Sequence, residues 1–205
     1  MTTSTENDAG RSVMDRLLHS AVDQLREIPT FRVRVDEVAD RAGIPRQEAR
    51  AIFPEDAALN ESLAGFAMVQ MADAMTQALI AAPGGDNRAA LIGLSEAYVN
   101  WARRNRALYG AISSRLLQPS GADSIVRRYD ASFAPLVRRY LSEDKPGSTT
   151  RRAALARAAM FGLTDLILER RETIWLLPHQ DLDAEISATI AELVDLLLTG
   201  RPAGG

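Results

Sequence analysis

The sequence has 205 residues, of which 46% are hydrophobic, and a formal net charge of -3 at pH 7. This composition is sufficient to bury a core, and the acidic balance excludes a strongly basic protein that coats nucleic acid. The chain contains no cysteine, which excludes disulfides, thiolate catalysis and most structural zinc sites. It also has no run of about eighteen uninterrupted apolar residues, and its start, MTTSTENDAG, lacks the pattern of a signal peptide. We therefore expect a soluble, cytoplasmic protein that does not enter a membrane.

Apolar residues at three- and four-residue steps predict an amphipathic first helix over about residues 11 to 27, which Pro29 ends. A short second helix is expected from 35 to 42, followed by Gly43, and a third from Pro45 to Phe53. The later periodic segments predict helices over about residues 55 to 82, 86 to 101, 105 to 117, a stretch ending near 141, 151 to 171 and 182 to 198. No segment alternates over the length of a strand, so the predicted fold is all-α with about nine helices.

Residues 35 to 53, VDEVADRAGIPRQEARAIF, have the size and punctuation of a helix-turn-helix, with Gly43 in the turn. At about 100° per residue, the inward side of the third helix is apolar and comprises Ala49, Ile52 and Phe53. The outward side comprises Gln47, Arg50 and Ala51, with Arg46 at its edge. Arginine suits phosphates and guanine edges, and glutamine suits adenine. The alternative is an ordinary solvated polar face.

The order of the first four helices, the segment VDEVADRAGIP, Phe53 and Ala58-Leu59 resemble the tetracycline-repressor (TetR) family of bacterial regulators. The resemblance covers about residues 11 to 65. More loosely, WARRNRALYGAI is similar to a middle segment of the family's sensing domain, and AAMFGLTDLIL to its penultimate, dimer-forming helix. The resemblance implies a homodimer that binds a pseudo-palindromic double-stranded DNA operator and a small-molecule effector. No cofactor and no metal are expected.

This resemblance divides the chain into a DNA-binding helix-turn-helix domain over residues 11 to 54 and a larger helical bundle for sensing and dimerisation over residues 55 to 200. Residues 1 to 10 and 201 to 205 are expected to be loose tails. The predicted DNA-binding residues are Arg34, Arg46, Gln47 and Arg50.

The sequence departs from the family pattern near the expected DNA. Arg50 stands where an aromatic residue is usual, and Ile52 stands where histidine is frequent. Asp56 replaces a lysine often found at the start of the fourth helix, so that it would repel the DNA backbone, whereas an acid in a first helical turn stabilises the helix. Arg34 falls where a hydroxyl residue often touches phosphate, and a salt bridge with Asp36 or Glu37 competes with that role.

Residues 1 to 60 contain eight arginines and eleven acidic residues, a net charge of 8 - 11 = -3 that equals the formal excess of the whole chain. DNA binding then requires the arginines to share one face.

Aromatic residues and methionines cluster at helical spacings in the second part of the chain, as in an apolar effector pocket, although each is more often plain core. The candidate effector-binding residues are Met71, Tyr98, Trp101, Tyr109, Phe133 and Phe161. The last two helices carry wide apolar faces that a second copy of the chain would cover, unless the monomer already does. The candidate dimer residues are Leu163, Leu166, Ile167, Ile190, Leu193 and Leu197.

Two other functions fit the sequence less well. An enzyme is disfavoured, because His19 and His179 are the only histidines and no glycine-rich phosphate loop is present. The main alternative is a TetR-like protein that has lost DNA binding and acts through a ligand or a protein. Asp56 and the net negative charge of residues 1 to 60 favour this alternative, because both would repel DNA.

Overall fold

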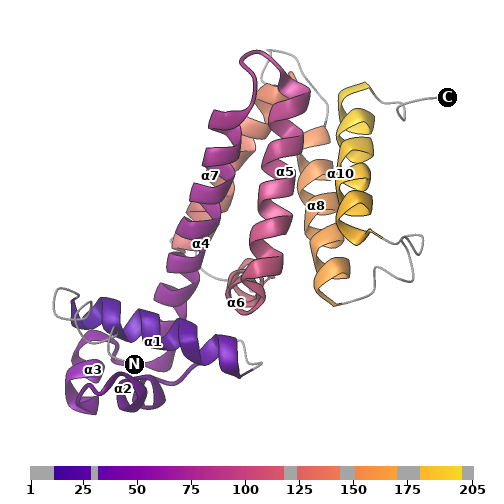
Figure 1. Cartoon of the computed structure of the whole chain (residues 1–205). Coiled ribbons are helices and arrows are strands. Elements are labelled where there is room, and N and C mark those ends of the chain that lie inside the picture. The colour runs from indigo at the N-terminus through magenta and orange to yellow at the C-terminus, as the bar shows by residue number, and fades with distance from the viewer. Residues whose placement is uncertain (1–11, 29–31, 118–123, 144–150, 170–180, 200–205) are drawn as a thin grey trace. The chain divides into compact units, whose positions relative to one another are not determined.

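The computed structural model describes residues 12–28, 32–117, 124–143, 151–169 and 181–199 (Figure 1). These residues form nine α-helices and no strand: α1 Val13–Glu27, α2 Val35–Ala42, α3 Arg46–Ile52, α4 Asp56–Ala81, α5 Asn87–Arg104, α6 Arg106–Leu117, α7 Ile125–Tyr140, α8 Arg152–Leu168 and α10 Leu182–Thr199. The prediction of an all-α fold of about nine helices is confirmed. His179 and the two expected tails lie outside the described residues.

Among the helix boundaries that differ from those expected, two have a clear local cause. Pro45 lies at the N-cap of α3 rather than inside its first turn, with φ of -55° and ψ of 130°. This extended ψ places the first helical residue at Arg46. Helix α5 continues beyond Trp101 to Arg104 and ends at Asn105, whose side-chain amide donates to the Trp101 carbonyl at 3.0 Å. This local bond ends α5 directly before α6.

The chain forms two compact units. The small unit comprises Met1–Met68 and Ala107–Val126, and the large unit comprises Val69–Arg106 and Arg127–Gly205. The small unit contains the whole segment predicted to bind DNA, together with the start of α4 and most of α6.

In the small unit, α1 packs against α2 and α3 around a core of aliphatic side chains (Figure 1). Leu17, Val35, Val38 and Leu59 have no exposed surface. Gly65 lies so close to the start of α7 that a Cβ there would be 2.6 Å from Cγ2 of Ile125. As its apolar spacing predicts, α1 buries one face against α2 and α3.

In the large unit, α5 packs against both α8 and α10 (Figure 1). Arg88 near the start of α5 pairs with Asp195 near the end of α10 at 2.5 Å, and Arg103 near the end of α5 pairs with Asp183 near the start of α10 at 2.6 Å. These two ion pairs show that α5 and α10 run antiparallel.

Helix α8 lacks a capping side chain of its own, because its N-cap residue is Arg151. The buried carboxylate of Glu143 takes that place. Its oxygens accept from the backbone N–H groups of Arg152 at 2.8 Å and Ala153 at 2.9 Å. Arg152 in turn donates to the Leu197 carbonyl of α10 at 2.9 Å. The start of α8 is thus tied to the end of α10.

Helix α4 is long and apolar enough, by length and composition alone, to cross a membrane. Charged and amide side chains interrupt it, however, including Glu61, Gln70 and Asp73. Leu63 and Met68 are buried inside the protein. This pattern is that of the core helix of a globular protein.

Candidate nucleic-acid interface

The turn between α2 and α3 has the backbone geometry that a helix-turn-helix requires. Gly43 adopts the left-handed conformation, with φ of 63°, which glycine takes without the penalty that a Cβ brings. The Ile44 N–H donates to the Ala39 carbonyl at 2.9 Å, and Arg16 of α1 donates to the Ala42 carbonyl at 3.0 Å. The end of α2 is therefore closed both by its own turn and by α1.

The inner face of the motif is fastened to the core of the small unit. Ala39 and Ala49 have no exposed surface, and Phe53 is buried. The Ser20 hydroxyl of α1 donates to the Val38 carbonyl at 3.2 Å. Because α3 buries this face, its opposite face is available at the surface, and there Gln47 is exposed.

The structure gives the positions of the four residues predicted to contact DNA, all of them in the small unit. Arg34 is the N-cap residue of α2, and its side chain is 67% exposed. Arg46 and Gln47 lie in the first turn of α3 and are exposed. Arg50 lies in the last turn of α3, with its side chain 38% exposed.

Each of the three arginines is paired with a carboxylate of the same unit. Arg46 makes a two-point contact with Asp40 of α2, with Nε at 2.8 Å from Oδ1.

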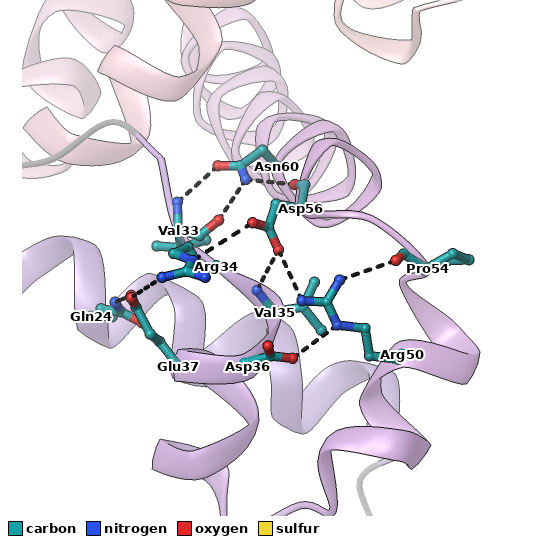
Figure 2. Close-up of polar contacts among 10 residues, drawn as sticks. All are labelled: Gln24, Val33, Arg34, Val35, Asp36, Glu37, Arg50, Pro54, Asp56 and Asn60. Atoms are coloured by element: carbon teal, nitrogen blue, oxygen red, sulfur yellow. Dashed lines mark hydrogen bonds and ion pairs between the residues drawn. The ribbon is translucent and has the colours of Figure 1, made fainter.

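Arg50 donates from Nε to Oδ1 of Asp36 at 2.8 Å and from Nη1 to the Pro54 carbonyl at 3.2 Å (Figure 2). Arg34 is more loosely paired, with Glu37 at 3.6 Å and Asp56 at 3.9 Å. The salt bridge expected for Arg34 is therefore present, and its partners are Glu37 and Asp56 rather than Asp36.

These contacts set the charge of the carboxylates. The hydrogen bond from Arg50 lowers the pKa of Asp36, and the hydrogen bond from Arg46 lowers the pKa of Asp40. The same bonds raise the pKa of both arginines. All four groups are therefore ionised at neutral pH, and the basic face of α3 is balanced by acids on α2.

Asp56 has a structural role in α2 as well as a place in the first turn of α4. Its Oδ1 accepts from the backbone N–H of Val35, the first residue of α2, at 2.9 Å (Figure 2). Arg34 is the N-cap residue and makes no side-chain capping bond. The carboxylate of Asp56 thus caps α2 from α4, and it also faces Nη2 of Arg50 at 3.8 Å.

Asn60, one turn further along α4, holds the same segment and was missed by the sequence analysis. Its Oδ1 accepts from the Val33 N–H at 3.0 Å, while its Nδ2 donates to the carbonyls of Val33 at 2.8 Å and Asp56 at 2.6 Å (Figure 2). Asn60 is buried. The arginine at the N-cap of α2 signals that the first N–H groups of this helix need an acceptor from elsewhere. That acceptor is Asp56, and the sequence carries no comparable signal for Asn60.

The candidate effector-binding residues do not all belong to one unit. Met71, Tyr98 and Trp101 are buried in the large unit, where Phe133 and Phe161 are half-buried. The guanidinium of Arg157 lies 5.2 Å from the ring centroid of Phe161. Tyr109 is buried in the small unit. A small cavity of about 120 Å³ in the large unit, between α5 and α10, is lined by none of these residues.

The candidate dimer residues differ in what surface they retain. Ile167 and Ile190 are buried within the large unit, because α10 packs on α5 and α8. The others are half-buried: Leu163, Leu166, Leu193 and Leu197. Among the six candidates, these four leucines retain surface that a second chain could cover. Leu155 of α8 and Leu196 of α10, which were not among the candidates, are exposed as well.

Several solved structures share this fold. A protein of unknown function from Rhodococcus sp. RHA1 matches with a TM-score of 0.75 and 23% identity, over 96% of this chain and 99% of that one. A TetR-like transcriptional regulator from the same organism matches with a TM-score of 0.63 and 16% identity, over 93% and 98%. LfrR, a TetR-like transcriptional regulator from Mycobacterium smegmatis solved in complex with proflavine, matches with a TM-score of 0.55 and 19% identity, over 93% and 96%.

No curated protein sequence matches the chain. The family model described as the tetracyclin repressor-like C-terminal domain matches residues 91–197, which is more than half of the 205 residues. The chain therefore belongs to the TetR family of transcriptional regulators.

Proposed function

We propose that the protein is a cytoplasmic, ligand-responsive repressor that binds a double-stranded, pseudo-palindromic operator as a homodimer and leaves it when a small apolar effector binds. The observation that carries this proposal is the two-sided character of α3. Ala49 and Phe53 are buried on one side, and Arg46 and Gln47 are exposed on the other. A short helix with this arrangement fits the major groove.

The three arginines and the glutamine have different proposed roles in DNA binding, which follow from their chemistry. Arg34, Arg46 and Arg50 contact phosphates, which supplies affinity without sequence preference, and Gln47 reads a base edge. On binding DNA, each arginine exchanges a carboxylate for a phosphate. That exchange is inexpensive, because exposed ion pairs contribute only about 0–1 kcal/mol each.

The position of Asp56 supports retention of DNA binding. Its carboxylate is engaged by the Val35 N–H at 2.9 Å and faces Arg50 at 3.8 Å and Arg34 at 3.9 Å. A carboxylate held between a backbone donor and two guanidinium groups repels a phosphate less than an isolated one does. Asp56 is therefore proposed to stabilise the helix-turn-helix rather than to prevent DNA binding.

The effector is proposed to bind among the apolar side chains of the large unit. Met71, Tyr98, Trp101, Phe133 and Phe161 are the candidate contacts there, whereas Tyr109 belongs to the small unit and is not part of this proposed site. The presence of proflavine in the LfrR complex supports a small-molecule site in a protein of this fold. A coupling free energy of about 1–3 kcal/mol between effector and operator would be enough for a useful switch.

The homodimer is proposed to form through α8 and α10 with a two-fold axis, which would present two reading helices to two half-sites. Leu163, Leu166, Leu193 and Leu197 would lie in the interface. Ile167 and Ile190 are already buried in the monomer, so they would stabilise the helices that form the interface rather than contact the second chain.

Selection of sequences from random double-stranded DNA at low salt tests the proposal, followed by titration of the selected site. We expect a palindromic site, with affinity lost uniformly across sequences in Arg50→Ala and preference relaxed at one position per half-site in Gln47→Ala. Arg41→Ala is the matched control, because Arg41 lies in the last turn of α2, outside the proposed DNA contacts, and it also loses a carboxylate partner, Glu27 at 2.7 Å. Absence of any preferred sequence would contradict the proposal and favour a relative that has lost DNA binding.

A further inference from the structure

A cavity of about 430 Å³ lies in the small unit, beside the segment that leads into α2. Its volume falls within the range of small-molecule sites, about 300–1,000 Å³. The polar part of its wall comprises Arg32, Arg34, Asp56, Asn60, Ser114 and Arg115. Val33, Ala57 and Ala111 provide an apolar part. Residues from three parts of the small unit therefore line the cavity: the segment that leads into α2, the start of α4, and α6.

The wall of this cavity is basic although the chain as a whole is acidic. Three guanidinium groups and one carboxylate give the lining a formal charge of 3 - 1 = +2, compared with -3 for the chain. Arg32 lies on the segment before α2, Arg34 at its N-cap, and Arg115 on α6. Glu37 and Glu61, which do not line the cavity, pair with Arg34 and Arg115. The wall therefore offers guanidinium groups from separate elements on one concave surface, rather than a free positive charge.

The ion pairs of Arg34 leave room for exchange. Arg34 lies 3.6 Å from Glu37 and 3.9 Å from Asp56, and these distances exceed the usual 2.7–2.9 Å of a charge-assisted hydrogen bond. An incoming carboxylate or phosphate can therefore take donors from Arg34 in better geometry. Arg115, which pairs with Glu61 at 3.4 Å, lies on the same wall.

The other polar groups of the wall do not compete for that role. Both N–H groups of Asn60 donate to backbone carbonyls, and its oxygen accepts from Val33. The Ser114 hydroxyl donates to the Ala111 carbonyl at 3.0 Å. The donors for a ligand are thus guanidinium groups, which match oxyanions, and the apolar part of the wall favours an organic group over a bare inorganic ion.

We propose that this cavity is a second ligand site, which binds a small organic anion: a carboxylate or phosphate monoester that carries an apolar group. The site is separate from the effector site proposed for the large unit. Its effect on DNA rests on the proposed function. Because Arg34 serves both the cavity and the operator, the anion and DNA compete, and each lowers the affinity of the other by the same factor.

Calorimetric titration of the full chain with benzoate, phenyl phosphate and neutral benzamide tests the site. We expect one saturable site per chain for at least one anion, with benzamide at least about tenfold weaker, since a hydrogen bond to a charged group contributes enough for a tenfold change in Kd. Equal affinity for benzamide would overturn the proposal, as would the absence of saturable binding of both anions below about 10 mM, weaker than the useful range.

Two variant pairs locate the site. Arg115→Gln should weaken anion binding about tenfold or more, whereas Arg106→Gln, exposed at the start of the same helix, should leave it unchanged. Ser114→Met should block the cavity, whereas the neighbouring Ser113→Met, whose wild-type hydroxyl donates to the Gly110 carbonyl at 3.2 Å, should not. Thermal melting confirms that each variant is folded, and normal anion affinity in folded Arg115→Gln and Ser114→Met would refute the site.

The link to DNA is measured separately. Phenyl phosphate or benzoate should lower operator affinity in the wild type and in Arg106→Gln but not in Arg115→Gln. If the protein binds no DNA, the repressor proposal fails while the calorimetric result still decides the anion site. If the anion binds and operator affinity stays constant, the competition at Arg34 is refuted.

Discussion

Asp56 at the first position of α4 accepts a hydrogen bond of 2.9 Å from the backbone N–H of Val35 at the first position of α2. The two residues are separated by the entire helix-turn-helix, so one carboxylate closes the motif on itself. Glu143 does the same for α8 in the large unit, where Arg151 stands at the N-cap. In both places an arginine replaces the usual capping residue, and an acid from another element supplies the missing acceptor.

Removing the Asp56 cap should lower the free energy of unfolding, but the small unit should remain folded. Asp56→Ala is expected to reduce the free energy of unfolding by about 0.5–2 kcal/mol, the usual value for a lost N-cap. Asp56→Asn keeps an acceptor and should lose less, while the removal of its charge should tighten DNA binding. Urea denaturation measures the first effect and DNA titration the second. Glu55→Gln, an exposed neighbour, is the control, and a loss there as large as in Asp56→Ala would argue against capping.

Asn60 should matter more than Asp56, because it is buried and makes three hydrogen bonds. Asn60→Ala leaves the N–H and carbonyl of Val33 without their partner, at an expected cost of about 2–4 kcal/mol in the free energy of unfolding. Asn100→Ala, an exposed amide on α5, should change it by less than about 0.5 kcal/mol. Similar melting temperatures for the two variants would refute the role assigned to Asn60.

Releasing Arg50 from Asp36 should strengthen DNA binding. Asp36→Asn removes the main partner of Arg50 and one negative charge near the phosphates, so operator affinity should rise severalfold, and most at low salt. Stability should change little, since the pair is partly exposed. Glu48→Gln, on the same helix, removes an equal charge without freeing Arg50. Equal gains in both variants would show that net charge alone is responsible.

The ion pairs of the small unit also predict that the free energy of unfolding depends on pH. The pKa values of Glu27, Asp36 and Asp40 are lowered by hydrogen bonds from Arg41, Arg50 and Arg46. Their stabilising effect is therefore fully present above the unfolded carboxyl pKa, about 4, and disappears as pH falls below it through the lower folded values. The free energy of unfolding, measured by urea from about pH 7 to pH 3, should fall in that acid range.

The Asp36→Asn variant supplies the check on this pH dependence, because it lacks one of the lowered carboxyl pKa values. Its acid loss of stability should be smaller than that of the wild type. A loss of the same size would mean that other carboxylates cause it.

The dimer prediction rests on the four half-buried leucines. Leu166→Glu combined with Leu193→Glu should shift the protein to a monomer in sedimentation and abolish binding to the full palindrome. Ile80→Glu, at a residue 72% exposed on α4, should leave the assembly unchanged. A wild-type monomer at micromolar concentration would refute the proposed interface.

Much of the fold could be predicted because helices depend on local spacing. Apolar residues at three- and four-residue steps, with Gly43, Pro54 and Pro83 as punctuation, mark most helix boundaries in the described part of the chain. The family assignment, and with it the expectation of a regulator rather than an enzyme, is confirmed by the matching family model. The roles of individual DNA-, effector- and dimer-contacting residues remain predictions.

What the sequence determined by itself was the helical order, the left-handed turn at Gly43 and the two faces of α3, since all three depend on residues close together in the chain. Tertiary structure decided the partners of the charged groups. It brought Asp56 to Val35, Arg34 and Arg50, gave Asn60 the Val33 backbone, and gathered Arg32, Arg34 and Arg115 around one cavity. Such pairings depend on which helix ends meet in space, and helical periodicity carries no information about that.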